Sequence, residues 1–406
     1  MGWPAPAGRC SNDAVDDPDS LGRYAEIASN SGVPRVARLT PRGRGAVATL
    51  RLEHAAAILD ADPPLFRAAN LRPASAQVIG RIVFGSFGCD APEDVVYCRR
   101  EEQVIELHCH GGDAAVARIL RDLRERGVTV EDWFEQESRR LGLFAAECRS
   151  ALARAPTLRT AELILAQNSG VLQSAVERVI AALPETSRAA RLLEEIWRWR
   201  HFGSRLTEPW RVGIVGRPNV GKSSLINALA GYERSIVFDE PGTTRDVVTV
   251  ETAFRGWPVQ IADTAGLRTA AGPLEAEGMR RARDYLATAD LVLMVFDRSQ
   301  PGAAIDLQLL AEFPTALVAA NKCDLPDAWG NTTPSTAVQV SATTGQGLGE
   351  LVDQIVSRLV PETPTATTAI PISHRQGETL GLAREALLRN DVEAAVTALR
   401  EMLTSG

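Results

Sequence analysis

The pattern of apolar and polar positions predicts a small mixed domain near the N-terminus. Four stretches alternate apolar and polar residues with the two-residue period of half-buried strands. They are residues 46–52, 78–84, 95–97 and 104–107. Residues 114–126 instead space their apolar side chains as an amphipathic helix does, and Gly127 ends that pattern. We therefore expect a small α+β domain over residues 34–132, preceded by a mobile leader at residues 1–33.

The strand pattern disappears after this domain. Residues 133–208 carry apolar residues at helical spacings. Residues 209–360 alternate strand-like and helix-like stretches, which is typical of an α/β domain with a mostly parallel sheet. Helical spacing returns in residues 361–406, so we expect the α/β domain to be inserted into one helical domain. The predicted fold class is a multidomain α/β and α protein.

Two helices are predicted in the C-terminal segment, over residues 379–388 and 392–403. A stretch rich in proline and threonine, residues 361–368, separates them from the α/β domain. Asn390 and Glu393 have the spacing of a capping box, which would begin the second helix.

Composition excludes several classes of protein. The 406 residues carry a net charge of −7, so no global basic field attracts nucleic acid, and any RNA contact must be local. Six cysteines occur without Cys-x-x-Cys pairs, which indicates reduced thiols rather than a disulfide or zinc framework. No apolar run approaches the roughly 18 residues of a membrane span. We expect a soluble, cytoplasmic protein without membrane contact.

Lysine is nearly absent from the chain. Of the 44 basic residues only Lys222 and Lys322 are lysines, and each lies within a phrase typical of a nucleotide site. Arginine replaces lysine readily on a solvated surface, but not where a compact ammonium on a flexible stem is needed. The two lysines therefore favour a working GTP site.

The first phrase has the pattern of a phosphate-binding loop. Residues 216–223 read Gly-Arg-Pro-Asn-Val-Gly-Lys-Ser, directly after an apolar strand and before a helix, which a chance glycine-rich turn would not explain. Backbone N–H groups of such a loop wrap the β-phosphate, while Lys222 reaches the phosphates and the Ser223 hydroxyl ligates Mg²⁺. The expected nucleotide contacts are Asn219, Val220, Gly221, Lys222, Ser223 and Ser224.

The second phrase predicts guanine as the base. Residues 321–324 read Asn-Lys-Cys-Asp and end a predicted strand. The Asp324 carboxylate, with Asn321 and Lys322 beside it, can accept both N–H donors of the guanine edge, a pair that adenine lacks. Ser341 and the amide of Ala342 follow one more strand and would complete the base pocket.

Two further phrases predict contacts near the γ-phosphate. Asp263 opens an Asp-Thr-Ala-Gly phrase at the end of a strand, where it can support the Mg²⁺ and Gly266 can bond the γ-phosphate. Residues 241–246 read Pro-Gly-Thr-Thr-Arg-Asp, between the first helix and the next strand. We expect Thr243 and Thr244 to contact the nucleotide there, with Thr244 as the second Mg²⁺ ligand.

The residues alone leave two candidates for the catalytic base. Leu267 stands where many small GTPases place a glutamine that orients water. Either Glu275 or Glu277 could act as the base, with a monovalent cation beside the phosphates in place of an arginine finger. Both glutamates could equally be solvated residues that favour the start of a helix.

The motifs and their order resemble the MnmE (TrmE) family of tRNA-modification GTPases. The resemblance implies an N-terminal tetrahydrofolate-binding domain, a helical domain and an inserted, potassium-activated GTPase domain. It implies that Asn219 coordinates K⁺ and that the glutamate twelve residues beyond Asp263, Glu275, is the hydrolytic base.

The N-terminal match is looser. It lies in residues 41–47, Pro-Arg-Gly-Arg-Gly-Ala-Val, and residues 106–112, Glu-Leu-His-Cys-His-Gly-Gly. The resemblance implies folate contacts at Arg51 and Glu106. The family's folate lysine has no counterpart near residues 154–155, and the last residues, Met-Leu-Thr-Ser-Gly, lack the family's Cys-x-Gly-Lys tail.

The resemblance also implies partners: a homodimer whose GTPase domains pair, an MnmG-like flavoprotein, and tRNA modified at the wobble uridine. Two alternatives remain open. One is a divergent paralogue that keeps the GTP switch without the tRNA chemistry, which the missing cysteine and lysine would fit. The other is a ribosome-assembly switch like the Era or Der GTPases. Residues 361–406 hold four arginines against six acidic residues and no Gly-x-x-Gly loop, which disfavours an RNA-binding domain there.

Overall fold

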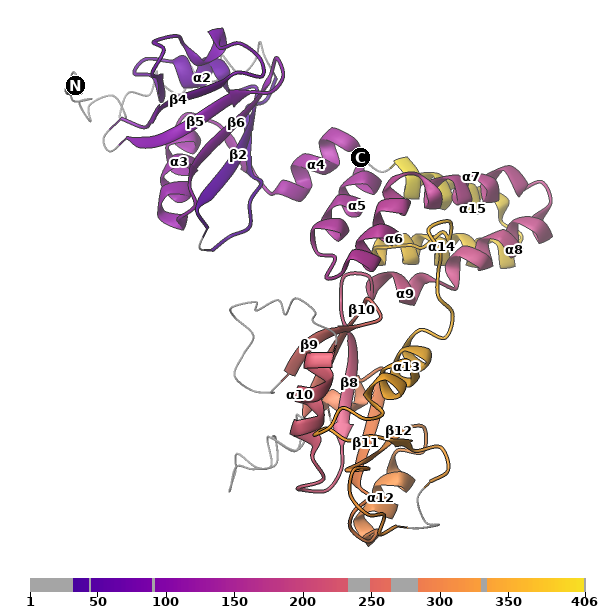
Figure 1. Cartoon of the computed structure of the whole chain (residues 1–406). Coiled ribbons are helices and arrows are strands. Elements are labelled where there is room, and N and C mark those ends of the chain that lie inside the picture. The colour runs from indigo at the N-terminus through magenta and orange to yellow at the C-terminus, as the bar shows by residue number, and fades with distance from the viewer. Residues whose placement is uncertain are drawn as a thin grey trace, which may run out of the picture. The chain divides into compact units, whose positions relative to one another are not determined.

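The computed structural model describes residues 32–43, 45–89, 92–232, 249–263, 284–329 and 334–404. Most of the expected leader, residues 1–31, lies outside these ranges. The chain divides into two compact units at Gly142 (Figure 1). No helix of the described ranges has the length and hydropathy that crossing a bilayer requires.

The described residues of the first unit form a seven-stranded sheet in the order β3-β4-β5-β6-β2-β1-β7. Neighbouring strands are antiparallel except β1 and β7, which are parallel. The strands are β1 (Arg35–Arg38), β2 (Val47–Glu53), β3 (Phe66–Ala68), β4 (Ile82–Phe87), β5 (Glu93–Arg99), β6 (Val104–His110) and β7 (Thr129–Glu131). The helices are α2 (Ala56–Asp60), the 3-10 helix η2 (Ala74–Ala76), α3 (Asp113–Glu125) and α4 (Trp133–Leu141).

The core of this unit follows the predicted periodicities. The apolar stripe of α3, Val116, Ile119 and Leu123, is buried in one cluster with the inward residues of β2. One prediction was wrong at its start: the strand expected from residue 78 begins only at Ile82. Gly80 has a left-handed φ of +79°, so residues 78–81 turn instead of extending.

Helix α4 belongs to the first unit, although its helical spacing placed residues 133–142 in the helical domain. Asp132 and Glu135 form its capping box. Arg139 of α4 donates a hydrogen bond to Glu53 of β2 at 2.8 Å, and this contact joins α4 to the sheet. Helical periodicity identifies a buried face, but it does not say which domain covers that face.

The second unit contains a helical region, residues 143–208 and 361–404, and an α/β region, residues 209–360. The helices of the helical region are α5 (Leu143–Ala153), α6 (Leu158–Asn168), α7 (Val171–Ala182), α8 (Thr186–Trp197), α9 (Arg200–Ser204), α14 (His374–Leu388) and α15 (Val392–Thr404). Figure 1 shows α14 and α15, in yellow, beside α7 and α8. Their apolar faces share one core, which includes Val176, Leu193, Leu380 and Leu399.

The cap of α15 differs from the expected capping box. Asn390 has a φ of +56° and lies in the turn between the two helices. The side chain of Asp391 accepts a hydrogen bond from the Ala394 N–H at 3.0 Å. Asp391 therefore caps α15, because Asn390 takes up the left-handed conformation that the tight turn requires.

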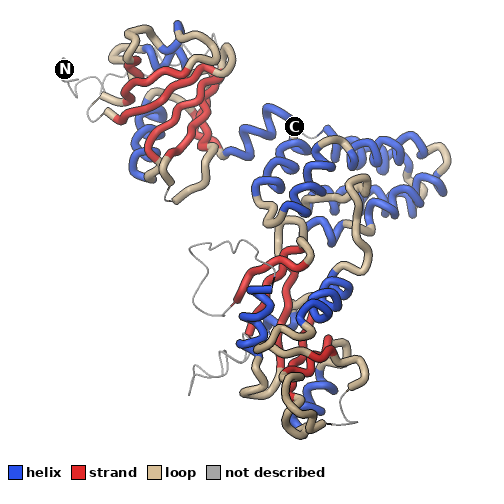
Figure 2. Tube along the Cα trace, viewed as in Figure 1, coloured by secondary structure: helices blue, strands red, loops and turns tan. Residues whose placement is uncertain are grey.

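The α/β region holds a six-stranded sheet in the order β13-β12-β11-β8-β10-β9 (Figure 2). All its strand pairs are parallel except that of β9 with β10, so the predicted mostly parallel sheet is confirmed. The strands are β8 (Trp210–Val215), β9 (Thr249–Phe254), β10 (Trp257–Asp263), β11 (Leu291–Asp297), β12 (Leu317–Asn321) and β13 (Val338–Gln339). The described helices are α10 (Lys222–Tyr232), α12 (Ala304–Glu312) and α13 (Leu348–Leu359).

The two regions of the second unit share a hydrophobic core. Phe202 of α9 packs edge-on against Trp257 of β10, with ring centroids 5.5 Å apart. The Arg159 guanidinium lies over the Trp257 ring at 4.5 Å from its centroid, and the Thr157 hydroxyl donates to the Gly256 carbonyl at 2.7 Å. The turn between β9 and β10 is thus fixed to the helical region.

Candidate nucleotide-binding site

The carboxyl ends of four parallel strands bring the predicted motifs together. β8, β10, β11 and β12 are neighbours in the sheet, and they end at Val215, Asp263, Asp297 and Asn321. Open α/β sheets bind ligands at this edge, where loops and helix N-termini converge. Three of these strand ends, at Val215, Asp263 and Asn321, adjoin predicted motifs that lie far apart in the sequence, and the strand order brings these described residues to one edge.

The phosphate-binding loop, residues 216–223, requires its two glycines for different reasons. A Cβ on Gly216 would lie 2.2 Å from the Val295 carbonyl oxygen, so the loop leaves β8 against the backbone of β11. Gly221 has a φ of +93°, and a Cβ there would lie 2.4 Å from the Asn321 Nδ2. Helix α10 then begins at Lys222, which directs its N-terminal N–H groups towards the loop.

Lys222 and Ser223 both have polar partners at the phosphate-binding loop. The Lys222 Nζ donates to the carbonyls of Gly216 at 2.9 Å and Arg217 at 2.6 Å, and the residue is 5% exposed. The Ser223 Oγ donates to the Asp263 Oδ2 at 2.8 Å. The Ser223 hydroxyl of α10 and the Asp263 carboxylate of β10 therefore lie together beside the loop. Ser224 is exposed on the first turn of α10.

The base-recognition loop, residues 321–324, is joined to the phosphate-binding loop by Asn321. Its Nδ2 donates to the Val220 carbonyl at 2.8 Å, and its Oδ1 accepts from the Ala342 N–H at 3.2 Å. Ser341 is fully buried, and its Oγ accepts from the Thr344 N–H at 3.1 Å. Asp324 is exposed beside them. Asn321 thus fixes the other two segments, while the Asp324 carboxylate is open to a base.

One charged residue of this site was missed by the motifs. Asp297, the last residue of β11, is 2% exposed and accepts a hydrogen bond from the Lys322 Nζ at 2.6 Å. Burial alone would raise the pKa of Asp297, but the hydrogen bonds from Lys322 and Ser299 outweigh it and lower that pKa. An aspartate that ends a buried strand was the available signal in the sequence.

The remaining predicted site residues lie outside the described ranges. They are Thr243, Thr244, Gly266 and Glu275, together with the alternative base Glu277. Asn219, the expected K⁺ ligand, is described: it is exposed, with a left-handed φ of +65°.

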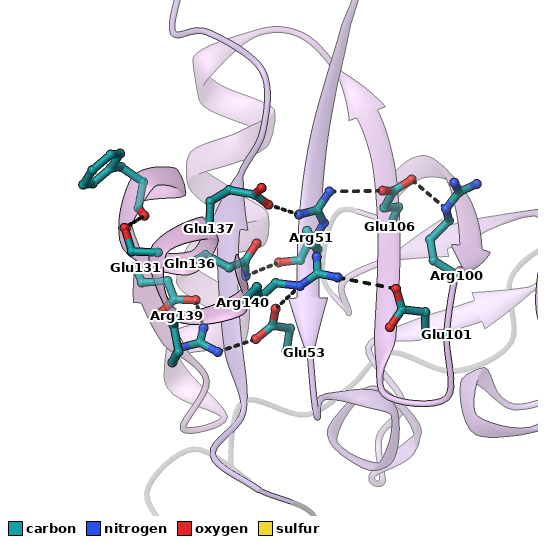
Figure 3. A network of polar contacts seen from close by, with 12 residues as sticks. Arg51, Glu53, Arg100, Glu101, Glu106, Glu131, Gln136, Glu137, Arg139 and Arg140 are labelled. Atoms are coloured by element: carbon teal, nitrogen blue, oxygen red, sulfur yellow. Dashed lines mark hydrogen bonds and ion pairs between the residues drawn. The ribbon is translucent and has the colours of Figure 1, made fainter. Parts of the chain in front are cut away.

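In the first unit, Arg51 and Glu106 are direct neighbours across β2 and β6. The Arg51 Nη2 lies 3.7 Å from the Glu106 Oε1, and its Nη1 donates to Glu137 of α4 at 2.5 Å. Figure 3 shows the wider network, in which Arg140 of α4 reaches both Glu53 and Glu101. The two expected folate contacts therefore lie together.

The loop after β8, the helix that begins at its lysine, and the polar residues at the strand ends define a P-loop GTPase. Residues 211–322 match the family model described as 50S ribosome-binding GTPase. The protein therefore binds GTP and GDP and is a GTP-hydrolysing enzyme.

The similarity to known proteins extends beyond this region. The tRNA modification GTPase MnmE of Synechococcus sp. (strain CC9605) is 34% identical over 410 residues, which cover 91% of this chain and 90% of the relative. Its counterpart from strain WH7803 is 37% identical over 332 residues, 72% of each chain. The chain belongs to the MnmE family of tRNA modification GTPases. The solved G domain of the T. maritima FeoB iron transporter is 29% identical and covers 37% of this chain and 99% of its own, with a TM-score of 0.28, too low to support a conclusion.

Proposed function

We propose that this protein is a potassium-activated GTPase whose nucleotide cycle serves the modification of a tRNA wobble uridine. The observation that carries the proposal is the extent of the similarity: the MnmE relative matches 91% of the chain, including the first unit and the helical region. A ribosome-assembly switch would account for residues 211–322 alone. The remaining residues favour the MnmE-type function.

The oxygen atoms beside the phosphate-binding loop fit Mg²⁺. The Ser223 hydroxyl and the Asp263 carboxylate, 2.8 Å apart, are hard oxygen donors of the kind that this ion prefers. Ser223 and Thr244 would be its protein ligands, with Asp263 supporting them. When bound, Mg²⁺ neutralises negative charge on the β- and γ-phosphates. Lys222 would add a second positive charge to the phosphates.

The proposed K⁺ ligand is Asn219. Its side chain is exposed at the tip of the phosphate-binding loop, and an amide oxygen suits a monovalent cation. A cation there supplies positive charge near the phosphates, as an arginine finger does in other GTPases. Glu275 is the proposed base that accepts a proton from the attacking water, and Thr243 and Gly266 would contact the phosphates.

The first unit is the proposed site for a tetrahydrofolate derivative. Arg51 and Glu106 offer a donor and an acceptor side by side. The buried Arg51 Nε and the Gln136 Oε1 have no hydrogen-bond partner among the described residues, so the site retains polar groups that a ligand can satisfy. Such a ligand must share Arg51 with Glu137 of α4. When bound, the folate supplies a one-carbon unit.

The proposed partners follow from the same function. We propose a homodimer in which GTPase regions pair, an MnmG-like flavoprotein, and tRNA, working in the cytoplasm where tRNA and GTP occur together. A divergent paralogue would keep GTP hydrolysis without these partners.

Complementation of an MnmE-deficient bacterial strain tests the proposal. We expect the full chain to restore wobble-uridine modification, measured by mass spectrometry of digested tRNA, and the Lys222→Ala variant to fail. Intact GTPase activity without modification in the complemented strain would instead establish the divergent paralogue.

A further inference from the structure

A buried carboxylate outside the recognised motifs lies behind the base-recognition loop. Asp297 is opposite Asn321 in the register of β11 and β12, and both are the last residues of their strands. Its Oδ2 accepts from the Lys322 Nζ at 2.6 Å. Its Oδ1 accepts from the backbone N–H and the hydroxyl of Ser299 at 2.9 and 2.6 Å. Both carboxylate oxygens are engaged, which fixes the orientation of the group.

The backbone around Asp297 is held as firmly as its side chain. The indole Nε1 of Trp329 donates to the Asp297 carbonyl at 3.0 Å, and Trp329 stacks on Phe296 with centroids 4.6 Å apart. The Arg298 N–H donates to the Asn321 carbonyl at 3.0 Å. Asp297 is therefore a rigid support next to the base-recognition loop, whereas a lysine side chain has four rotatable bonds of its own.

Lys322 bridges two functional segments. Its φ of +64° is left-handed, and its Nζ donates both to Asp297 and to the Asn219 carbonyl, the latter at 3.3 Å. The ammonium thus lies between the base-recognition loop and the phosphate-binding loop. A compact ammonium can serve two acceptors in different directions, which a planar guanidinium does less well. This contact gives a physical reason for one of the two lysines in a chain that otherwise uses arginine.

We propose that Asp297 is a positioning residue for guanine-nucleotide binding, which holds the Lys322 ammonium between the base-recognition loop and the phosphate-binding loop. The proposal rests on the placement of guanine beside residues 321–324. Asp297 acts through Lys322 and does not touch the nucleotide. It therefore affects the affinity for GDP and GTP alike and leaves the hydrolytic step unchanged.

A double-mutant cycle on the full chain tests this role. The variants are Asp297→Asn, Lys322→Met and the double variant, and the Kd values for fluorescent GDP and GTP analogues are measured. We expect each single change to raise the Kd for both nucleotides by about tenfold or more, as the loss of a charged hydrogen bond does. The double variant should bind each nucleotide no less tightly than the single variant with the higher Kd, because the two residues act as one unit. Asp297→Asn should raise KM for GTP and leave kcat unchanged.

Two further variants separate positioning from stability. Asp290 precedes the opposite end of β11 and pairs with Arg205 at 2.6 Å, so Asp290→Asn removes a half-buried ion pair away from the nucleotide. It should lower Tm without changing Kd. Ser299→Ala removes one hydrogen bond from Asp297 and keeps the charge pair. Ser299→Ala should raise the Kd for GDP by about threefold. It tests the same role if the Asp297→Asn protein does not fold.

Two results would overturn the proposal: additive effects of the single variants, or an Asp297→Asn protein that loses Tm as Asp290→Asn does while it binds GDP within twofold of the wild type. The placement of guanine is tested separately by Asp324→Ala, which should lose the preference for GDP over ADP. If Asp324→Ala keeps that preference, the base placement is wrong, and the Asp297 proposal fails with it.

Discussion

At the scale of single residues, the charged groups described at the nucleotide site have defined partners. Lys222 donates to two backbone carbonyls of its own loop, Asp263 accepts from the Ser223 hydroxyl, and Asp297 accepts from Lys322. A buried charge without such partners would be strongly unfavourable, so these contacts let charged groups sit at the edge of an apolar sheet. They also fix the positions of the groups before a nucleotide arrives, which reduces the entropy lost on binding.

Lys222→Ala should abolish nucleotide binding. The change removes the only side-chain ammonium of the phosphate-binding loop and should raise the Kd for GDP at least about a hundredfold. Titration of a fluorescent GDP analogue measures this. Arg211→Ala, an exposed change on β8, is the control and should bind normally. Micromolar affinity in Lys222→Ala would contradict the phosphate-binding assignment.

Two buried thiols should be chemically inert. Burial raises the pKa of Cys148 to about 12 and that of Cys109 to about 11. A raised thiol pKa keeps the reactive thiolate scarce at pH 8, so both residues should resist iodoacetamide in the folded protein. Peptide mass spectrometry should find them labelled only after denaturation. Rapid labelling of Cys148 at pH 8 without denaturant would contradict the burial.

At the scale of elements, one glutamate joins helices that are far apart in the sequence. Glu147 of α5 is 8% exposed. It accepts hydrogen bonds from Ser373 at 2.9 Å, from Arg375 at 2.8 and 2.7 Å, and from Gln376 at 2.8 Å, all at the start of α14. These bonds tie the helices before the α/β region to those after it. The helical region is therefore closed by polar contacts as well as by its apolar core.

Glu147→Gln should destabilise the helical region by about 3 kcal/mol, because it leaves Arg375 without its buried counter-charge. Urea unfolding followed by helical circular dichroism measures the loss. Glu194→Gln is the matched control, since Glu194 pairs with Arg384 of the same helix α14 at an exposed site. It should cost less than about 1 kcal/mol. Equal losses in the two variants would show that burial of the Glu147 pair is not what stabilises these helices.

At the scale of the whole molecule, the six-stranded sheet of the α/β region shares a hydrophobic core with the helical region. The shared core around Phe202 and Trp257 fixes the turn between β9 and β10, and β10 ends at Asp263 beside the phosphate-binding loop. One strand, β10, therefore runs from the contact with the helical region to the edge of the phosphate-binding loop.

Replacing K⁺ by Na⁺ should slow GTP hydrolysis by about tenfold or more, because the smaller ion fits the proposed Asn219 site less well and leaves phosphate charge uncompensated. Phosphate release by the full chain in matched chloride buffers measures this. Asn219→Ala should hydrolyse at the slow rate in both salts. Equal rates in K⁺ and Na⁺ for the wild type would remove Asn219 from the cation role.

The sequence by itself determined the class of this protein. The site motifs contain Lys222, Ser223, Asp263 and Asn321. Their chemistry depends on the spacing of nearby residues, which can be read from the sequence without knowing the fold. The period of the apolar residues likewise predicted α3 and the parallel sheet, because helices and strands bury one face at a fixed repeat.

The tertiary structure decided which distant residues act together. Asp297 meets Lys322, Glu147 meets Arg375, and α4 joins the first unit through Arg139. None of these pairs has a fixed sequence spacing, since each depends on the order of strands in a sheet or the packing of helices around a core. Ion pairs between elements are set by that arrangement. The sequence therefore predicted the motifs, and the fold revealed the residues that hold them in place.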